Sequence, residues 1–392
     1  MKKIIILILA GSLYLFSCGK GDRKITSGSD SAKTKEKIES SGESSAEKKE
    51  YSLNDFLKED GTLNAFTDKI FGSLATDEEK VAQIVVTFGG KSGKPDADVK
   101  KIIKEKKAGG VILLGGTKEY MKGMINSLNQ IIDSNRYLPL LYMTDAEPSL
   151  LSKKIGGLPD FKSASAITNK EINGIAENIT LLIKDIGFNM NLAPVCDFPD
   201  NKEIIGKRSF GNKNRILELS VAFIRETQKQ NVIATAKHFP GHGRVKGDSH
   251  KELVYLENNI DDEIQVFKQV IDAGVLSIMA GHIAVKEGKY STDGLPATLS
   301  RKIITDILKG ELGFKGLVIT DAMNMEAVSK RNKPSLNAVI AGNDLILAPS
   351  DEGILISSIV EKMKTDESFK QQIYQSVKKI IRMKICMGLI KI

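Results

Sequence analysis

The sequence predicts an α/β protein that folds as a single (β/α)8 barrel of the TIM type. Eight short apolar runs follow one another between residues 84 and 347, and amphipathic segments of helical length separate them. Polar residues come directly after several of the runs, where catalytic residues of a barrel lie. An open doubly wound sheet is the alternative that the pattern leaves open, although no G-x-G-x-x-G sequence follows the first run.

The eight runs have the composition of parallel strands that are buried on both faces, because they are apolar without strict alternation. They cover residues 84–88, 110–114, 138–144, 188–195, 232–236, 276–280, 316–320 and 344–347. We expect the polar residues that follow them at the carboxyl-terminal rim of the barrel. These residues are Asp145, Asp197, Lys237, His238, His282 and Asp321.

The segments between the runs carry the start and stop signals of helices. Thr168 and Glu171 have the spacing of a capping box, a stripe of isoleucines follows, and Gly187 ends the predicted helix. Asp261 opens another helix, and Ser300 caps a third. Strand and helix therefore alternate as a barrel requires.

Composition and charge favour an enzyme of the α/β class over a nucleic-acid-binding protein. Of the 392 residues 41% are hydrophobic and 27% are charged, and the net charge is +8. The lysines are interleaved with Asp and Glu and form no dense basic run with aromatic residues, so we expect a solvated surface. The cysteines, Cys18, Cys196 and Cys386, form no C-x-x-C pair and predict no disulfide framework, and Cys196 is expected to be buried.

The first fifty residues have the features of an export signal and a linker. A basic start and an apolar run end at Leu15-Phe16-Ser17-Cys18, which looks like a bacterial lipobox with a bulky Phe16. We expect residues 1–18 to be a lipoprotein signal peptide with Cys18 lipidated; an ordinary secretory peptide is the alternative. Residues 19–50, rich in Ser, Lys and Glu, predict a flexible tether, and residues 51–392 the barrel domain. The protein is thus expected to be exported and anchored to the cell envelope by its N-terminal lipid.

The segment 237–250, with the sequence KHFPGHGRVKGDSH, contains three of the four histidines of the chain. A zinc helix is not expected, because Pro240 and Gly241 separate His238 from His242 and no HExxH glutamate is present. Packed structural histidines are a second interpretation. The third is acid/base catalysis, in which Asp248 bonds the ring of His250 and raises its pKa so that it donates a proton near neutrality.

Asp321 follows an apolar run in the segment ITDAMNM. A carboxylate at the end of a strand points toward the barrel mouth, although an N-cap for the following helix is the alternative. A carboxylate that faces a proton donor across a sugar is the arrangement of a retaining glycosidase.

Both segments resemble glycoside hydrolase family 3. KHFPGHG with the following DSH is similar to the signature of its β-N-acetylglucosaminidase branch, and VITDAMNMEAV is similar to its nucleophile segment. Weaker similarities follow in the family's order, such as GGVILLGG at 109–116, NLAPVCDF at 191–198 and AGNDLIL at 341–347. The resemblance implies a retaining exo-β-N-acetylglucosaminidase without metal or cofactor. Asp321 would be the nucleophile, His250 the acid/base and Asp248 its partner.

The resemblance also implies four substrate-binding residues. Lys237, His238 and Arg208 match positions that bind sugar hydroxyls, and Asp145 matches the carboxylate that binds the non-reducing end. The family pattern Asp-x-Glu-Gly-Gly followed by an Arg is altered here, because the segment reads DAEPSLLSKK and Lys153 or Lys154 stands where the Arg is expected. Pro cannot adopt positive φ, so we expect this loop to follow a different path.

The expected substrates are peptidoglycan fragments or chitin-type oligosaccharides. Three alternatives remain open at this point: a β-glucosidase or xylosidase of the same family, an enzyme that uses phosphate in place of water, and a lipid-anchored sugar-binding protein without turnover. We expect no nucleic-acid partner, and membrane contact through the lipid anchor.

Overall fold

The structure, a computed structural model, describes residues 50–249, 251–257 and 259–391. The predicted signal peptide, Cys18, the tether up to residue 49 and His250 lie outside the described residues.

Eight parallel strands form the central sheet of the described chain. They are β1 (Val85–Gly89), β2 (Gly110–Leu113), β3 (Leu141–Thr144), β4 (Met190–Asn191), β5 (Ile233–Phe239), β7 (Ser277–Ala280), β9 (Leu317–Thr320) and β10 (Ile346–Leu347). Their order is β10-β1-β2-β3-β4-β5-β7-β9, and a bridge between Ile319 and Leu345 brings β9 beside β10. The sheet is therefore a nearly closed barrel. The predicted barrel is confirmed, and the open-sheet alternative is wrong.

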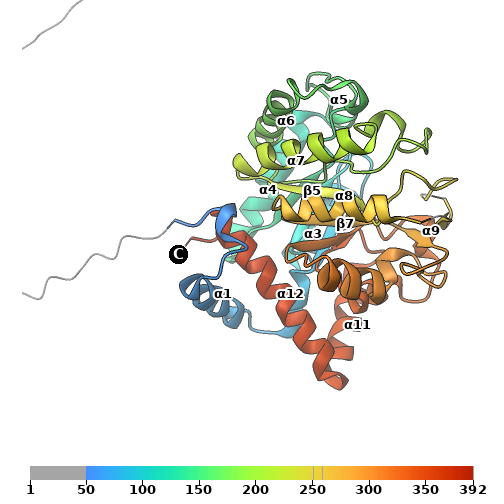
Figure 1. Cartoon of the computed structure of the whole chain (residues 1–392). Helices are drawn as coiled ribbons and strands as arrows, with labels where there is room; N and C mark the ends of the chain where they lie inside the picture. The colour runs from blue at the N-terminus through green and yellow to red at the C-terminus, as the bar shows by residue number, and fades with distance from the viewer. Residues whose placement is uncertain (1–49, 250, 258, 392) are drawn as a thin grey trace, which may run out of the picture. The chain divides into compact units, whose positions relative to one another are not determined.

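Helices connect successive strands and surround the barrel (Figure 1). The α-helices are α1 (Gly61–Ser73), α2 (Asp77–Ala82), α3 (Asp96–Lys104), α4 (Lys118–Asn135), α5 (Leu151–Lys154), α6 (Ile172–Ile186), α7 (Lys213–Lys229), α8 (Asp261–Asp272), α9 (Glu326–Ser329), α10 (Pro334–Ala341), α11 (Glu352–Thr365) and α12 (Glu367–Cys386). Four 3₁₀ segments add to them: η1 (Leu53–Asp55), η2 (Ala164–Ala166), η3 (Gly206–Arg208) and η4 (Ala297–Leu299). A π-helix, η5 (Lys302–Glu311), precedes β9.

The three helices predicted from capping signals are present. The carboxylate of Glu171 accepts hydrogen bonds from the amide and hydroxyl of Thr168, and Gly187 ends α6 at φ 113°. Asp261 begins α8 as expected. Ser300 precedes η5, which is a π-helix rather than the expected α-helix, and its hydroxyl accepts a bond from the Ile303 amide at 3.4 Å.

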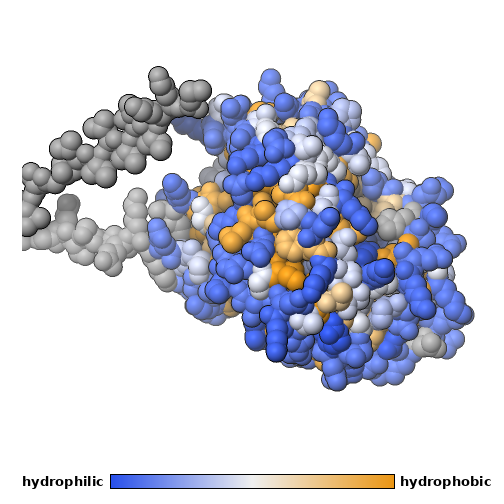
Figure 2. All heavy atoms as spheres, turned by 90° about the horizontal axis from the view of Figure 1, so that it is seen from above, coloured by the Kyte–Doolittle hydropathy of each residue, from blue (hydrophilic) through white to orange (hydrophobic). Residues whose placement is uncertain are grey.

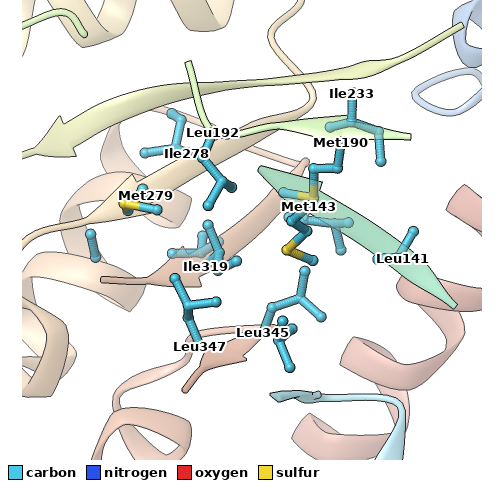
Figure 3. Close-up of a cluster of buried hydrophobic side chains, with 14 of the residues drawn as sticks. Leu141, Met143, Met190, Leu192, Ile233, Ile278, Met279, Ile319, Leu345 and Leu347 are labelled. Carbon is cyan, nitrogen blue, oxygen red and sulfur yellow. The ribbon is translucent and has the colours of Figure 1, made fainter. Parts of the chain in front are cut away.

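Apolar side chains from the strands fill the barrel (Figure 3). Met143 and Met190 point into the same interior as Ile319, Leu345 and Leu347, which come from the opposite part of the barrel, and all are buried. Because these side chains come from strands far apart in the sequence, their contacts hold the barrel together. Burial at about 25 cal/mol per Å² of apolar surface is the main stabilising contribution to such a core. Cys196 is buried, as predicted.

The face shown in Figure 2 is largely hydrophilic around its outline, with apolar side chains gathered near its middle. This distribution agrees with the interleaved charges of the sequence. Among the described residues, no helix has both the length and the apolar character needed to cross a lipid bilayer.

Candidate active site

Asp145 and Glu147 lie on the turn that follows β3. Asn191, at the end of the neighbouring strand β4, holds this turn through both of its side-chain groups. Its Oδ1 accepts a bond from the Ala146 amide at 3.0 Å, and its Nδ2 donates to the Ala146 carbonyl at 3.3 Å. No residue from 145 to 154 adopts positive φ, in agreement with the path predicted for a loop that contains Pro148.

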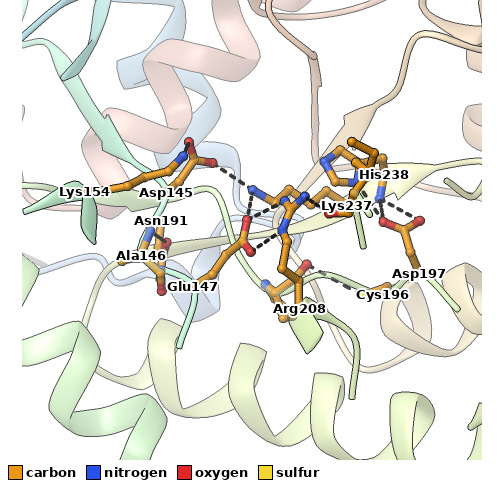
Figure 4. Close-up of polar contacts among 12 residues, drawn as sticks. Asp145, Ala146, Glu147, Lys154, Asn191, Cys196, Asp197, Arg208, Lys237 and His238 are labelled. Carbon is orange, nitrogen blue, oxygen red and sulfur yellow. Dashed lines mark hydrogen bonds and ion pairs between the residues drawn. The ribbon is translucent and has the colours of Figure 1, made fainter. Parts of the chain in front are cut away.

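Lys237, near the end of β5, joins these two carboxylates (Figure 4). Its Nζ lies 2.8 Å from Asp145 Oδ1 and 2.7 Å from Glu147 Oε1. Of the two lysines that could stand for the expected arginine, Lys154 binds the other oxygen of Asp145, at 2.7 Å. Arg208 binds Glu147 in a bidentate pair, with both distances 2.8 Å.

These contacts keep the cluster charged. Burial alone would raise the pKa of Glu147, but Lys237 and Arg208 outweigh it and lower this pKa to about 2. Burial likewise opposes ionisation of Asp145, and Lys237 and Lys154 hold its pKa well below the usual range. Burial would lower the pKa of Lys237, yet Asp145 and Glu147 raise it. Asp145 and Glu147 therefore stay negatively charged, and Lys237 stays positively charged, at pH values below and above 7.

The end of β5 is irregular, which turns Lys237 and His238 toward the rim. The pairing of β5 with β7 shifts register between Lys237 and Phe239, a distortion common beside active sites. Asp197, after β4, accepts bonds from the amides of His238 and His242 and from the Nδ1 of His238, the last at 2.7 Å. A carboxylate only accepts, so Nδ1 of His238 carries a proton. Asp197 is thus a buried carboxylate that holds the start of the loop after β5.

Two glycines let the loop after β5 pack closely on its neighbours. A Cβ on Gly243 would lie 1.8 Å from the Phe198 carbonyl oxygen, and one on Gly241 would lie 2.5 Å from Glu263 Cγ. His242 Nε2 lies 2.8 Å from Ser249 Oγ, which ties the two ends of this loop together. Burial and then His238 lower the pKa of His242 to about 4, so its ring is neutral at pH 7.

Asp321 directly follows β9. Its Oδ1 accepts a bond from the Ala322 amide at 2.8 Å. The helix after it, α9, begins at Glu326 with Met325 as N-cap, so Asp321 does not cap a helix and that alternative is wrong. Burial opposes ionisation, but His238 and then His282 lower the pKa of this carboxyl. Asp321 is therefore an ionised carboxylate at neutral pH.

One cavity of about 290 Å³ brings the predicted residues together. Its lining includes the five predicted site residues Asp145, Arg208, Lys237, His238 and Asp321. Lys154, His242, Ser249 and Asn324 also line it, and the sequence argument had not assigned them to the site. Glu147, which holds Arg208 and Lys237, was also missed, although it occupies the third position of the Asp-x-Glu pattern.

Of the predicted acid/base pair, the structure describes Asp248 but not His250. Asp248 is partly buried, and its Oδ2 lies 3.5 Å from Lys251 Nζ. Ser249, between them in the sequence, lines the cavity, so this loop reaches the site. Among the described residues, no group of three or more His, Cys, Asp or Glu side chains is arranged to hold a metal ion.

Comparison with protein families identifies the chain. Residues 76–383 match the family described as "Glycosyl hydrolase family 3 N terminal domain". The chain belongs to glycosyl hydrolase family 3. The match spans every strand of the barrel and every predicted catalytic and substrate-binding residue, and it makes this family 3 chain a glycosidase, an enzyme that acts on an oligosaccharide.

Relatives in the family carry a consistent name. A protein of Vibrio cholerae serotype O1 named "Beta-hexosaminidase" is 32% identical over 265 residues, which are 64% of this chain and 78% of the relative. A "Beta-hexosaminidase" of Tolumonas auensis is 31% identical, over 64% of this chain and 79% of the relative.

Solved structures agree with the family. A glycoside hydrolase family 3 β-N-acetylglucosaminidase from Paenibacillus sp. FPU-7 superposes with TM-score 0.73 at 29% identity. The alignment covers 80% of this chain and 63% of that one, so the chain spans less than two thirds of that structure. A β-N-acetylhexosaminidase from Beutenbergia cavernae gives TM-score 0.70 at 25% identity, over 78% of this chain and 97% of the other.

Proposed function

We propose that this family 3 chain is a retaining exo-β-N-acetylglucosaminidase. The observation that carries the proposal is the cavity in which an ionised Asp321 shares the lining with Asp145, Arg208, Lys237 and His238. Its volume of about 290 Å³ is small for a ligand pocket and suits one sugar ring. Relatives named β-hexosaminidase support the choice of the N-acetylated sugar.

In this mechanism Asp321 attacks the anomeric carbon as the bond to the leaving oxygen breaks. His250, oriented by Asp248, donates the proton that the leaving oxygen takes up. A glycosyl ester on Asp321 results. His250 then removes a proton from water, which attacks the anomeric carbon and releases the sugar with its configuration retained.

The charged cluster supplies binding and orientation of the sugar. Lys237 and Arg208 carry hydrogen-bond donors, and Asp145 offers a carboxylate acceptor at the same cavity. Both carboxylate oxygens of Asp145 are already bound by lysines, so its position is fixed before substrate arrives. Such pre-organisation reduces the entropy lost on reaching the reactive geometry. The proposed natural substrates are peptidoglycan fragments or chitin-type oligosaccharides.

A panel of 4-nitrophenyl glycosides tests the proposal. We expect the purified enzyme to cleave the β-N-acetylglucosaminide faster than the β-glucoside or β-xyloside, and to need no phosphate. Asp321→Asn should lower kcat on the order of 10³-fold, whereas Asp306→Asn, at an exposed position on η5, should not change it. Preference for the glucoside, or a sugar phosphate as the main product when phosphate is added, would overturn the assignment. Binding without any cleavage would favour a sugar-binding protein.

We also propose that the protein is exported and anchored by a lipid on Cys18. The apolar run that ends at Cys18 and the polar composition of residues 19–50 support this location. An anchored enzyme of this kind would act on envelope or external glycans.

A further inference from the structure

The backbone on both sides of Asp321 is held by the chain that follows β7. The Asp321 amide donates to the Ala280 carbonyl at 2.8 Å. Two residues further along, His282 Nε2 lies 3.0 Å from the Ala322 carbonyl oxygen. The peptide group that precedes Asp321 and the one that follows Ala322 are thus both tied to the segment 280–282.

The hydrogen bond of His282 to a carbonyl places a proton on one of its ring nitrogens. A carbonyl oxygen can only accept, so Nε2 carries the proton that is donated to Ala322. On the other side of the ring, Nδ1 lies 2.9 Å from Thr298 Oγ1, a hydroxyl that donates to a bare Nδ1 or accepts from a protonated one. Thr298 belongs to η4, and its own carbonyl accepts a bond from Asn343 Nδ2 at 2.9 Å. His282 therefore lies in a chain of hydrogen bonds. The chain runs from Asn343 through Thr298 and His282 to Ala322, in the turn after β9.

The position of this turn sets the direction of the Asp321 carboxylate. The same residue, Ala322, donates its amide to Asp321 Oδ1 at 2.8 Å. The Ala322 amide and carbonyl flank the same Cα, so a displacement of the carbonyl that His282 binds would also displace the amide that holds the carboxylate. His282 is fully buried and does not line the cavity, so it acts on Asp321 through the Ala322 backbone and not on the sugar.

We propose that His282 is a positioning residue for Asp321: protonated at Nε2, it holds the carbonyl of Ala322, the residue whose amide aims the nucleophile. The catalytic consequence rests on the proposed function, whereas the proton on Nε2 and its hydrogen bond do not. A misplacement of the nucleophile by about 1 Å is enough to cost on the order of 100-fold in rate.

Replacement by amides separates positioning from packing. In His282→Gln the amide nitrogen reaches the place of Nε2 and can still donate to Ala322, whereas in His282→Asn the shorter side chain cannot. We expect kcat to fall about 10- to 100-fold in His282→Asn with KM nearly unchanged. In His282→Gln, kcat should fall less than about 5-fold. Equal losses in the two variants, or a loss that appears in KM alone, would overturn the positioning role.

Imidazole ¹⁵N NMR of the wild-type protein gives a readout that does not require activity. We expect Nε2 of His282 to carry a proton at pH 7, with its assignment made by comparison with His282→Gln. A neutral ring protonated at Nδ1 alone would refute the assigned hydrogen bond. A confirmed proton on Nε2 in a protein without glycosidase activity would refute the proposed function while leaving this geometry in place.

Discussion

Lys237 and Glu147 form an ion pair beneath the cavity floor, with a distance of 2.7 Å between Nζ and Oε1 and only 2% exposure of each side chain. Two charges that are removed from water in this way depend on each other, because each would be left unpaired without its partner. Glu147 also binds Arg208, so a single carboxylate holds two of the predicted sugar-binding residues in place.

Glu147→Ala should therefore destabilise the protein strongly. Removal of one partner of a buried pair typically costs about 3–5 kcal/mol in the free energy of unfolding. Chemical unfolding followed by circular dichroism measures the change. Glu326→Ala is the matched control, since its pair with Lys330 is exposed and should contribute less than about 1 kcal/mol. Equal effects of the two substitutions would show that the buried cluster is not needed for stability.

Lys154 should contribute to substrate binding through Asp145. In Lys154→Ala, Asp145 keeps its bond to Lys237 but loses one of its two anchors. We expect KM for the aryl N-acetylglucosaminide to rise about 3- to 10-fold with little change in kcat, because a partly exposed charged hydrogen bond contributes about 1 kcal/mol. Steady-state kinetics measure this, with the exposed neighbour Lys153→Ala as control. If both alanine variants behave like wild type, Lys154 has no part in the sugar site.

Glu263, in the first turn of α8, should reduce stability at neutral pH. Its side chain is 3% exposed, and its carboxylate oxygens have no hydrogen-bond partner within the described chain. Burial raises its pKa to about 6, above the ordinary 4.5, despite Arg244. The stability contributed by the protonated form is complete below pH 4.5 and is lost as pH rises through 6.

Glu263→Gln should thus be more stable than wild type at pH 7.5, by about 2 kcal/mol, with the difference vanishing near pH 4.5. Denaturant unfolding of both proteins at pH 7.5 and pH 4.5 measures this difference in the free energy of unfolding. Glu257→Gln, at an exposed position, serves as the control. A variant less stable than wild type at pH 7.5 would mean that attraction to Arg244 outweighs the cost of burial.

Cys18→Ala should release the protein from the membrane. Lipid attached to this cysteine would hold the chain in the membrane fraction, and without it the exported chain has no acyl anchor. Fractionation of producing cells and labelling with a radioactive fatty acid measure the change. Cys386→Ala is the matched control. Persistence of Cys18→Ala in the membrane fraction would refute lipidation at this residue.

The sequence was sufficient to predict the barrel because parallel strands buried on both faces are apolar along their whole length. The predicted runs were longer than the strands where a backbone amide is missing. The run 188–195 narrowed to Met190–Asn191 as a continuous strand, and pairing resumes beyond Pro194, which has no amide, in a bridge between Val195 and Lys237. The small rim sheet of β6 (Val254–Leu256) and β8 (Ile283–Val285) was not predicted, since three-residue strands from distant segments leave no periodic pattern.

The site was predictable where a motif marked it and not where a contact depended on the fold. Lys237, His238 and Asp321 follow apolar runs, so their place at the rim could be inferred. Glu147 lies in the Asp-x-Glu pattern and His282 follows an apolar run, yet neither signal shows what the side chain contacts. The role of Glu147 depends on Lys237, 90 residues away in sequence, and that of His282 on the Ala322 carbonyl, 40 residues away. These contacts exist only once the barrel has closed.

Covalent trapping tests the central assignment most directly. The enzyme would be incubated with a slow fluorinated N-acetylglucosaminide, digested, and its peptides mapped by mass spectrometry. The account predicts one sugar attached to the peptide that contains Asp321, with no label in Asp321→Asn. A label on Asp145, Asp197 or another carboxylate, or turnover of the analogue by Asp321→Asn at the wild-type rate, would contradict it.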